Sequence, residues 1–168
     1  MKIGRKIALF YTLVTVLTTM AVIGVFYLFS SRYIDGLYRS YLREKAFLTA
    51  QKHWERDEVD EQSYQTIQRK YDELLPEAKE ILLDMDSDAV VRDTLNKYLT
   101  QHQQALLLAG QDSIPFSFKY KDQLGAALYY PDNEGNFIVL VMSRNAYGTE
   151  IKEHLLLLSI FLILASSV

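Results

Sequence analysis

Residues 7–51 are IALFYTLVTVLTTMAVIGVFYLFSSRYIDGLYRSYLREKAFLTAQ, and this stretch decides the fold. Its first part, Ile7 to Ser30, has 24 residues without a charged side chain. As a helix it is roughly 36 Å long, which is enough to cross a hydrocarbon core of about 30 Å. Ser31 to Gln51 contains no proline and one glycine, so the helix can continue from the membrane into solvent. The sequence predicts a membrane-anchored rod that carries the rest of the chain.

Three basic residues before the apolar segment predict its orientation. Lys2, Arg5 and Lys6 favour a cytoplasmic N-terminus, because the basic flank of a first span stays inside. They would also suit a cleaved secretory signal, but the apolar region of a signal is only about 7–15 residues long and ends at an A-x-A-like site, which is absent here. We expect an uncleaved anchor over residues 7–31, with residues 1–6 inside and the next domain outside.

The last stretch, Leu155 to Val168 (LLLLSIFLILASSV), is a second uncharged segment. As a helix its 14 residues cover only about 21 Å, which is too short to cross the membrane. A buried helix of a soluble domain can have this composition, but the absence of charge favours the start of a second, truncated transmembrane helix. We expect the chain to return to the cytoplasm here, with its effector part beyond Val168.

Residues 32–154 lie between the apolar segments and are enough for one compact domain. They hold all 21 acidic and 15 of the 18 basic residues, and so carry a net charge of −6. This balance fits an extracytoplasmic domain and argues against a nucleic-acid or anionic-membrane surface. The chain has no cysteine, which excludes disulfides and is compatible with a bacterial periplasmic domain stabilised by packing alone.

The first half of this domain has mainly helical patterns. Apolar residues at helical spacing, followed by a proline, predict a helix from Ser63 to Leu75. Residues 81–85 alternate as in a short strand, and residues 89–91 fit either another strand or a helix. A Thr100 cap and the glycine at 110 predict a short helix over residues 100–108.

The second half has the clearest strand pattern. Residues 114–120, 123–130 and 136–143 are rich in aromatic and β-branched residues, which favour strands. Lys121–Asp122 and Asp132–Gly135 supply the turns between them. Both faces of the last strand are apolar, which predicts a central strand covered by helices. The predicted fold class is α+β: a long N-terminal helix, a helical segment and a small antiparallel sheet, flanked by two transmembrane helices.

The run ERDEVDE, from Glu55 to Glu61, holds five acidic residues out of seven and is a candidate site for a divalent cation or a cationic peptide. It has no EF-hand or other fixed ligand spacing, so a solvated loop in which Asp60 caps the next helix is the favoured interpretation. His102 has no triad or ligand partner at a recognisable spacing. Motifs for nucleotide binding, an activated nucleophile or zinc are also absent. The sequence therefore predicts no catalytic, cofactor-binding or metal site within these residues.

Three further stretches carry a resemblance to a known family. They are EKAFLTAQKHWERDE (44–58), LLPEA (74–78) and GAALYYPDNEGNFIVLVMS (125–143). Together with the two apolar segments, they resemble the N-terminal sensor region of Bacteroidetes two-component sensor histidine kinases. The resemblance covers nearly the whole chain, although residues 86–110 match no pattern of the family. It implies a PAS-like or CACHE-like periplasmic sensor domain, anchored in the bacterial inner membrane.

The resemblance also implies a function outside the residues in hand. The cytoplasmic part of such a kinase carries the phospho-accepting histidine and uses ATP and Mg²⁺. The implied partners are membrane lipid, a second copy in a homodimer, a response regulator and a periplasmic ligand or protein, without nucleic acid. The alternatives are the sensor region of a chemoreceptor or cyclase, and a membrane-anchored interaction domain without a kinase.

The resemblance suggests where a stimulus would act. PAS-like folds place ligands between the sheet and its covering helices, which makes Tyr129, Tyr130, Ser143 and Arg144 the candidate sensing residues. Core and turn packing is the competing role for these four residues, because aromatic strand residues usually belong to a core.

Two sets of residues on the first helix form a candidate dimer seam. They are Ala8, Thr12, Thr15 and Thr19 within the apolar segment, and Ile34, Leu37, Tyr41 and Leu48 beyond it. Small residues at this spacing let two membrane helices approach closely, although threonines also bond back to their own helix. The outer four residues continue an apolar stripe that faces either a partner rod or the domain's own sheet. We expect a parallel homodimer along this seam.

Overall fold

The computed structural model describes residues 2–54, 61–75, 77–85, 88–109, 114–133 and 135–166. The chain divides into two compact units. The first unit holds residues 1–36 and 146–168, and the second holds residues 37–145. Residues 55–60, which make up most of the acidic run, lie outside the described residues. The candidate metal site and the Asp60 cap predicted there lie outside them as well.

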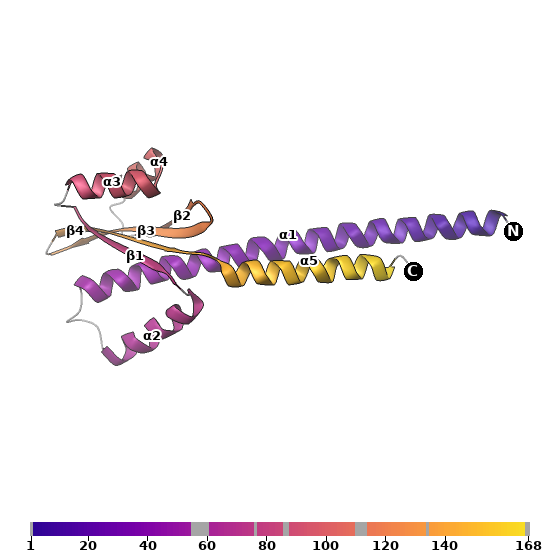
Figure 1. Cartoon of the computed structure of the whole chain (residues 1–168), viewed down its shortest axis with the longest axis horizontal. Coiled ribbons are helices and arrows are strands. Elements are labelled where there is room, and N and C mark those ends of the chain that lie inside the picture. Colours follow the sequence, from indigo (N-terminus) through magenta and orange to yellow (C-terminus); the bar gives the residue numbers. More distant parts are fainter. Residues whose placement is uncertain are drawn as a thin grey trace. The chain divides into compact units, whose positions relative to one another are not determined.

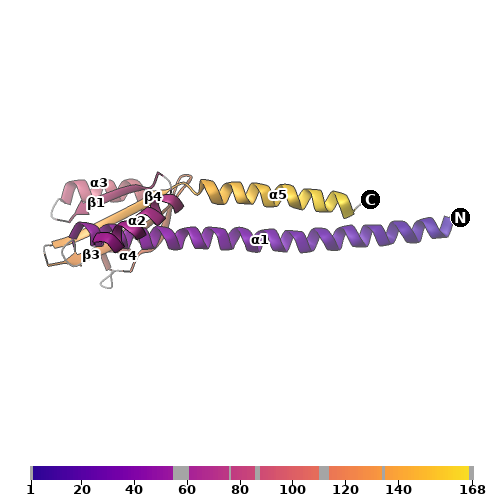
Figure 2. The ribbon, with the colours of Figure 1, turned by 90° about the horizontal axis from the view of Figure 1, so that it is seen from below.

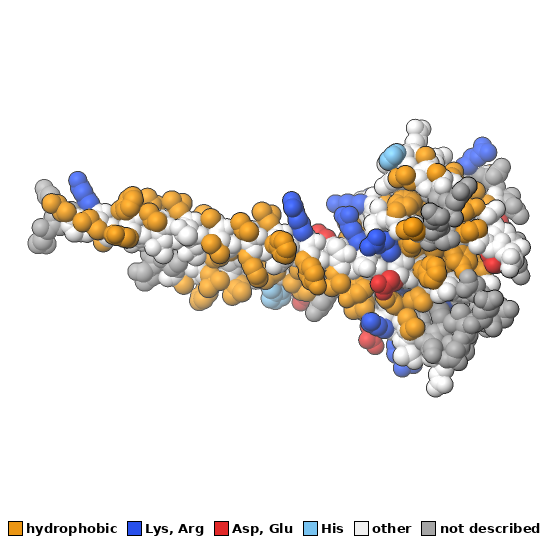
Figure 3. Space-filling model, turned by 180° about the vertical axis from the view of Figure 1, so that it is seen from behind, with side chains coloured by type: hydrophobic (Ala, Val, Ile, Leu, Met, Phe, Trp, Pro, Cys, Tyr) orange, Lys and Arg blue, Asp and Glu red, His pale blue; other side chains and the backbone are white. Residues whose placement is uncertain are grey.

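Helix α1 (Lys2–Trp54) is continuous over 53 residues, and parts of it belong to both units. Among the described residues it is the one helix that is long and apolar enough to cross a membrane, and none of its most apolar segment is buried. Hydrophobic side chains cover much of the visible face of the first unit (Figure 3). Outward-facing apolar side chains suit contact with lipid. The prediction of a long, apolar N-terminal helix is confirmed.

Helix α5 (Ala146–Ser166) completes the first unit. It begins before the uncharged segment at Leu155, and in both ribbon views it runs antiparallel to the first part of α1 (Figures 1 and 2). Lys152 Nζ lies 2.6 Å from Asp35 Oδ1, which joins the two helices by an ion pair. Its role as a second membrane span stays a prediction.

The second unit is built on a four-stranded antiparallel sheet in the order β1-β4-β3-β2 (Figure 1). The strands are β1 (Lys79–Asp84), β2 (Phe116–Tyr120), β3 (Gln123–Asp132) and β4 (Gly135–Ser143). The apolar strand β4 lies between β1 and β3, where both of its faces can be covered. The predicted central position of this strand is confirmed.

The two faces of β4 belong to two separate cores. Val139 and Val141 lie in the first core, with α1 and α2 (Glu61–Leu74). Ile138, Leu140 and Met142 lie in the second core, with α3 (Asp88–Tyr98) and α4 (Gln101–Ala109). Figure 1 shows α3 and α4 on one side of the sheet and α2 on the other. The unit is therefore a three-layer α+β structure.

The end of α1 is held on the sheet by aromatic stacking. The rings of Trp54 and Phe137 are stacked with centroids 4.2 Å apart, and Tyr130 lies 6.0 Å from Trp54 on the same side. Stacked rings of this size contribute to stability beyond the area that they bury. Because Trp54 is the only tryptophan of the chain, its fluorescence reports on this contact.

Residues 89–91 belong to helix α3, so the alternative of a strand there is wrong. The reason is a helical spacing of apolar residues, since Val91, Leu95 and Tyr98 are buried in the second core while Val90 is 62% exposed. The predicted cap of the next helix is confirmed. Gln103 N lies 3.4 Å from Thr100 Oγ1 and Thr100 N donates to Gln103 Oε1 at 2.9 Å, as in a capping box.

Candidate functional site

The four candidate sensing residues do not converge on one site. Tyr129 and Tyr130 are neighbours on β3, so their side chains point to opposite faces of the sheet. Tyr129 packs against the second core and donates a hydrogen bond to Asn136 Oδ1 at 2.7 Å. Tyr130 is buried in the first core. Ser143 and Arg144 lie together at the end of β4, where the Ser143 hydroxyl and the Arg144 carbonyl oxygen contact Tyr38 of α1. The Arg144 side chain points elsewhere and forms an ion pair with Asp122, with Nε 2.8 Å from Oδ2.

The contact at the end of β4 is centred on Tyr38, and we call it the Tyr38 junction. The Tyr38 hydroxyl lies 2.8 Å from Ser143 Oγ and 2.9 Å from the carbonyl oxygen of Arg144. Burial raises the pKa of Tyr38, and the hydrogen bond to Ser143 opposes this rise. The hydroxyl is therefore protonated at neutral pH and can donate. The junction joins the two places where the chain enters and leaves the second unit, Leu37 and Asn145.

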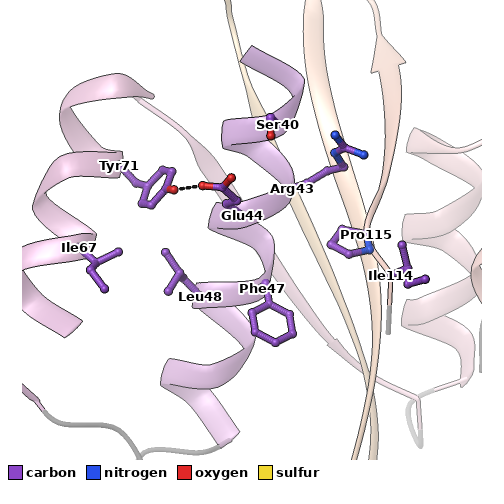
Figure 4. A pocket seen from close by; sticks show the side chains of 9 residues that line it. All are labelled: Ser40, Arg43, Glu44, Phe47, Leu48, Ile67, Tyr71, Ile114 and Pro115. Carbon is purple, nitrogen blue, oxygen red and sulfur yellow. Dashed lines mark hydrogen bonds between the residues drawn. The ribbon is translucent and has the colours of Figure 1, made fainter. Parts of the chain in front are cut away.

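A groove opens on the outer side of α1, and we call it the α1–α2 groove (Figure 4). Its volume is about 530 Å³, within the range of about 300–1,000 Å³ that is usual for small-molecule sites. The lining residues are Ser40, Arg43, Glu44, Phe47 and Leu48 of α1, Ile67 and Tyr71 of α2, and Ile114 and Pro115 before β2. Among the described residues no strand residue lines it, so the groove is not a cavity between the sheet and its helices.

The groove is polar at one end and apolar at the other. Ser40 and Arg43 lie at the polar end, where Tyr71 donates a hydrogen bond to the Glu44 carboxylate (Figure 4). Phe47, Leu48 and Ile67 lie toward the other end (Figure 4). An apolar lining with a few polar groups is typical of a site that binds an organic molecule.

Phe47 connects this groove to a candidate sensing residue. Its ring packs edge-on against that of Tyr130, with centroids 6.2 Å apart. Tyr130 in turn lies beside Trp54, and so contacts the last turn of α1. Tyr130 therefore lies behind the groove wall and not within the groove itself.

A buried lysine lies on the neighbouring face of α1. Lys45 Nζ is 2.6 Å from Asp72 Oδ1 on α2 and 3.1 Å from Glu80 Oε1 on β1. Burial by itself would lower the pKa of Lys45, but the hydrogen bonds and charges of the two carboxylates outweigh it and raise the pKa. The lysine stays charged and joins α1, α2 and the sheet, which indicates a structural role.

The residues of the candidate dimer seam differ in their surroundings. Ala8, Thr12 and Thr15 are exposed, and the Thr15 hydroxyl donates to the Tyr11 carbonyl oxygen at 2.9 Å. Thr19 and Ile34 are half-buried, and Leu37 is 41% exposed. Tyr41 and Leu48 pack against the first core of their own domain. Two of the outer residues thus pack against their own domain, and the seam itself stays a prediction.

The described part of the chain holds no group of three or more His, Asp or Glu residues that could bind a metal ion. His102 is exposed on α4. No protein-family model matches the chain, and neither a curated protein nor a solved structure matches it.

Several residues at these sites had no signal of their own in the sequence. Arg43 and Ser40 belong to a helix with many polar residues, and nothing in the local pattern separates them from their neighbours. The pairing of Lys45 with Asp72 joins residues 27 apart, which local periodicity cannot show. The one usable hint was the apolar stripe of α2, because Ile67 and Tyr71 lie at helical spacing.

Proposed function

We propose that this chain is the extracytoplasmic sensor and membrane-anchor region of a two-component sensor histidine kinase in a bacterial inner membrane. In this proposal residues 32–154 form a PAS-like or CACHE-like periplasmic domain and α5 begins a second transmembrane helix. A cytoplasmic part that uses ATP and Mg²⁺ follows and transfers phosphoryl groups to a response regulator. The working form is a homodimer.

The Tyr38 junction is the observation that supports this proposal most strongly. A sensor must pass a structural change from its external domain to the segments that lead into the membrane. The chain enters the second unit through α1 and leaves it after β4, and the junction joins these two segments by hydrogen bonds in a buried setting. Because hydrogen bonds are directional, a small shift of β4 along α1 would break these contacts, as a two-state switch requires.

Phosphorylation of the complete gene product in membrane vesicles tests the kinase. We expect ATP labelled at the γ-phosphate to give a phosphoryl group that is labile in acid and stable in base, as phosphohistidine is. Transfer of this label to a response regulator would support the proposal further. An acid-stable label, or none, would contradict it and leave the two alternatives, the sensor region of a chemoreceptor or cyclase and a membrane-anchored interaction domain.

The variant Tyr38→Phe tests the junction in the same assay. It removes a hydroxyl worth about 1 kcal/mol and keeps the ring, so the domain should stay folded while the switch is biased. We expect a change of about fivefold in the level of phosphorylation. Tyr41→Phe is the matched control, because its ring packs edge-on against Tyr71 with no described hydrogen bond at its hydroxyl. If both variants were phosphorylated to the same level as the wild type, the Tyr38 junction would have no role in passing on the signal.

A further inference from the structure

The polar end of the α1–α2 groove holds a cation that is free to bind a ligand. Arg43 and Ser40 lie about one helical turn apart on α1, on the same face. Within the described ranges, neither side chain makes a hydrogen bond or an ion pair. A guanidinium group presents a planar set of donors that matches a carboxylate, and a neighbouring hydroxyl can donate one more bond.

The other charged residue that lines the groove, Glu44, already has a hydrogen-bond partner. The Glu44 carboxylate accepts the hydrogen bond of Tyr71, which ties α1 to α2 across the groove (Figure 4). The negative charge of Glu44 repels an anionic head group, and Arg43 can balance only one negative charge of the ligand. The groove therefore favours a head group with a single negative charge over one with two or more. A cationic ligand would meet the unpaired Arg43 and be repelled.

The rest of the lining favours an apolar body. Phe47, Ile67 and Ile114 come from three separate segments, and they are 38%, 41% and 74% exposed. Leu48 and Pro115 add further apolar surface to the lining. Covering apolar side chains on three sides of one groove is favourable in proportion to the area removed from water.

We propose that the α1–α2 groove binds a free amphiphilic monocarboxylate, with its carboxylate on Arg43 and Ser40 and an apolar chain along Phe47, Leu48 and Ile67. A chain of roughly ten carbons fits a groove of this volume. The inference goes beyond the proposed function, since binding at this groove requires no kinase.

Photo-crosslinking of the full chain in nanodiscs of zwitterionic lipid tests the proposal. The probe is decanoate with a diazirine near its apolar end, and the crosslinked residues are identified by mass spectrometry. We expect label on residues that line the apolar end of the groove, displaced by excess decanoate and not by decyltrimethylammonium. Label confined to residues 7–30 would show partition into lipid only and would overturn the proposal.

Two variants and a control sharpen this experiment. Arg43→Gln should lower groove labelling about tenfold, because it removes a charge-assisted bidentate contact. Arg39→Gln removes an arginine of α1 that does not line the groove, and labelling should be unchanged. Ile67→Asp places a charge at the apolar end of the groove and should abolish groove labelling.

The outcomes separate this site from the kinase. Thermal unfolding, followed by Trp54 fluorescence, checks that each variant is folded. Groove labelling that survives both Arg43→Gln and Ile67→Asp would overturn the site. Groove labelling in a protein without phosphohistidine would contradict the proposed kinase and leave the site standing.

Discussion

Lys45 shows how a charged residue can belong to the interior of this domain. Its side chain is 7% exposed, whereas those of Asp72 and Glu80 are 54% and 37% exposed. The two carboxylates remain partly hydrated, so solvent screens their attraction to the lysine and the net stabilisation is modest. The network holds α1 against α2 and β1 at a place where the core needs a long side chain.

Lys45→Met should therefore destabilise the protein only modestly. Methionine keeps most of the buried volume, and the carboxylates that remain can be hydrated. We expect a loss of about 1 kcal/mol in the free energy of unfolding. The double variant Asp72→Asn/Glu80→Gln leaves a buried ammonium without counter-charge and should cost more, about 2 kcal/mol. Urea unfolding followed by Trp54 fluorescence measures both losses, with Lys52→Met as the exposed control. A larger loss for Lys45→Met than for the double variant would contradict this account.

The same network predicts a dependence on alkaline pH. The folded-state pKa of Lys45 lies above its ordinary value of 10.5, so the folded protein holds this proton more tightly than the unfolded chain. Its contribution to stability is full below that value and is lost as the pH rises through the folded pKa. As the pH rises above 10.5, the wild type should lose more unfolding free energy than Lys45→Met. If the unfolding free energies of the two proteins fell equally with pH, Lys45 would not be the cause of the loss.

Gly125 is required by the packing of an aromatic ring. It pairs with Phe118 across β2 and β3, and a Cβ at this position would lie within 2.8 Å of three carbons of the Phe118 ring. Because Phe118 is buried in the second core, the ring has little room to move. Gly125→Ala should cost about 2 kcal/mol of unfolding free energy, measured in the same urea experiment. The cost should shrink when Phe118→Leu is also present, and an equal cost in both backgrounds would exclude the ring as its cause.

Residue-level sites were the least predictable part of this protein. Tyr129 and Tyr130 were chosen as a pair, yet neighbours in a strand must point to opposite faces. Ser143 and Arg144 do lie together, but their shared partner, Tyr38, is 105 positions before Ser143. Contacts over such separations depend on the tertiary fold, which residue type and spacing do not encode.

At the scale of elements, the patterns of apolar residues were sufficient where they were strong. Strand β4 has apolar residues on both faces and is central, and α1 contains no proline and is continuous. Residues 89–91 were ambiguous because three consecutive apolar residues fit both the helical and the strand period. The burial of Val91 and Leu95 on one face of α3, which decides the case, depends on the position of the sheet.

Cysteine cross-linking tests whether α1 forms the proposed dimer seam. We expect single cysteines at Ala8, Thr12, Ile34 and Leu37 to cross-link between protomers, with a helical period along α1. Leu42 is fully buried in its own domain, and a cysteine there should not cross-link. Tyr41 and Leu48, which pack against the first core, should give weak signals. Uniform or absent cross-linking would mean that α1 is a passive anchor.

For the whole molecule, the predicted topology depends mainly on how charged and apolar residues are distributed along the chain. The basic residues at the start of α1, the uncharged segment that follows and the acidic domain between the two apolar stretches all favour one topology. The second unit has two cores of its own and a sheet whose strands all lie within residues 79–143. It therefore has the properties of a domain that can stand outside the membrane.

Reporter fusions test the topology most directly, a domain held outside the membrane by an anchor whose N-terminus lies inside. A reporter that is active only in the periplasm is fused after Asn145, where the second unit ends, and in a second strain ahead of Met1. A reporter that is active only in the cytoplasm is fused at the same two positions. We predict periplasmic activity after Asn145 and cytoplasmic activity ahead of Met1. Cytoplasmic activity after Asn145 would contradict the account.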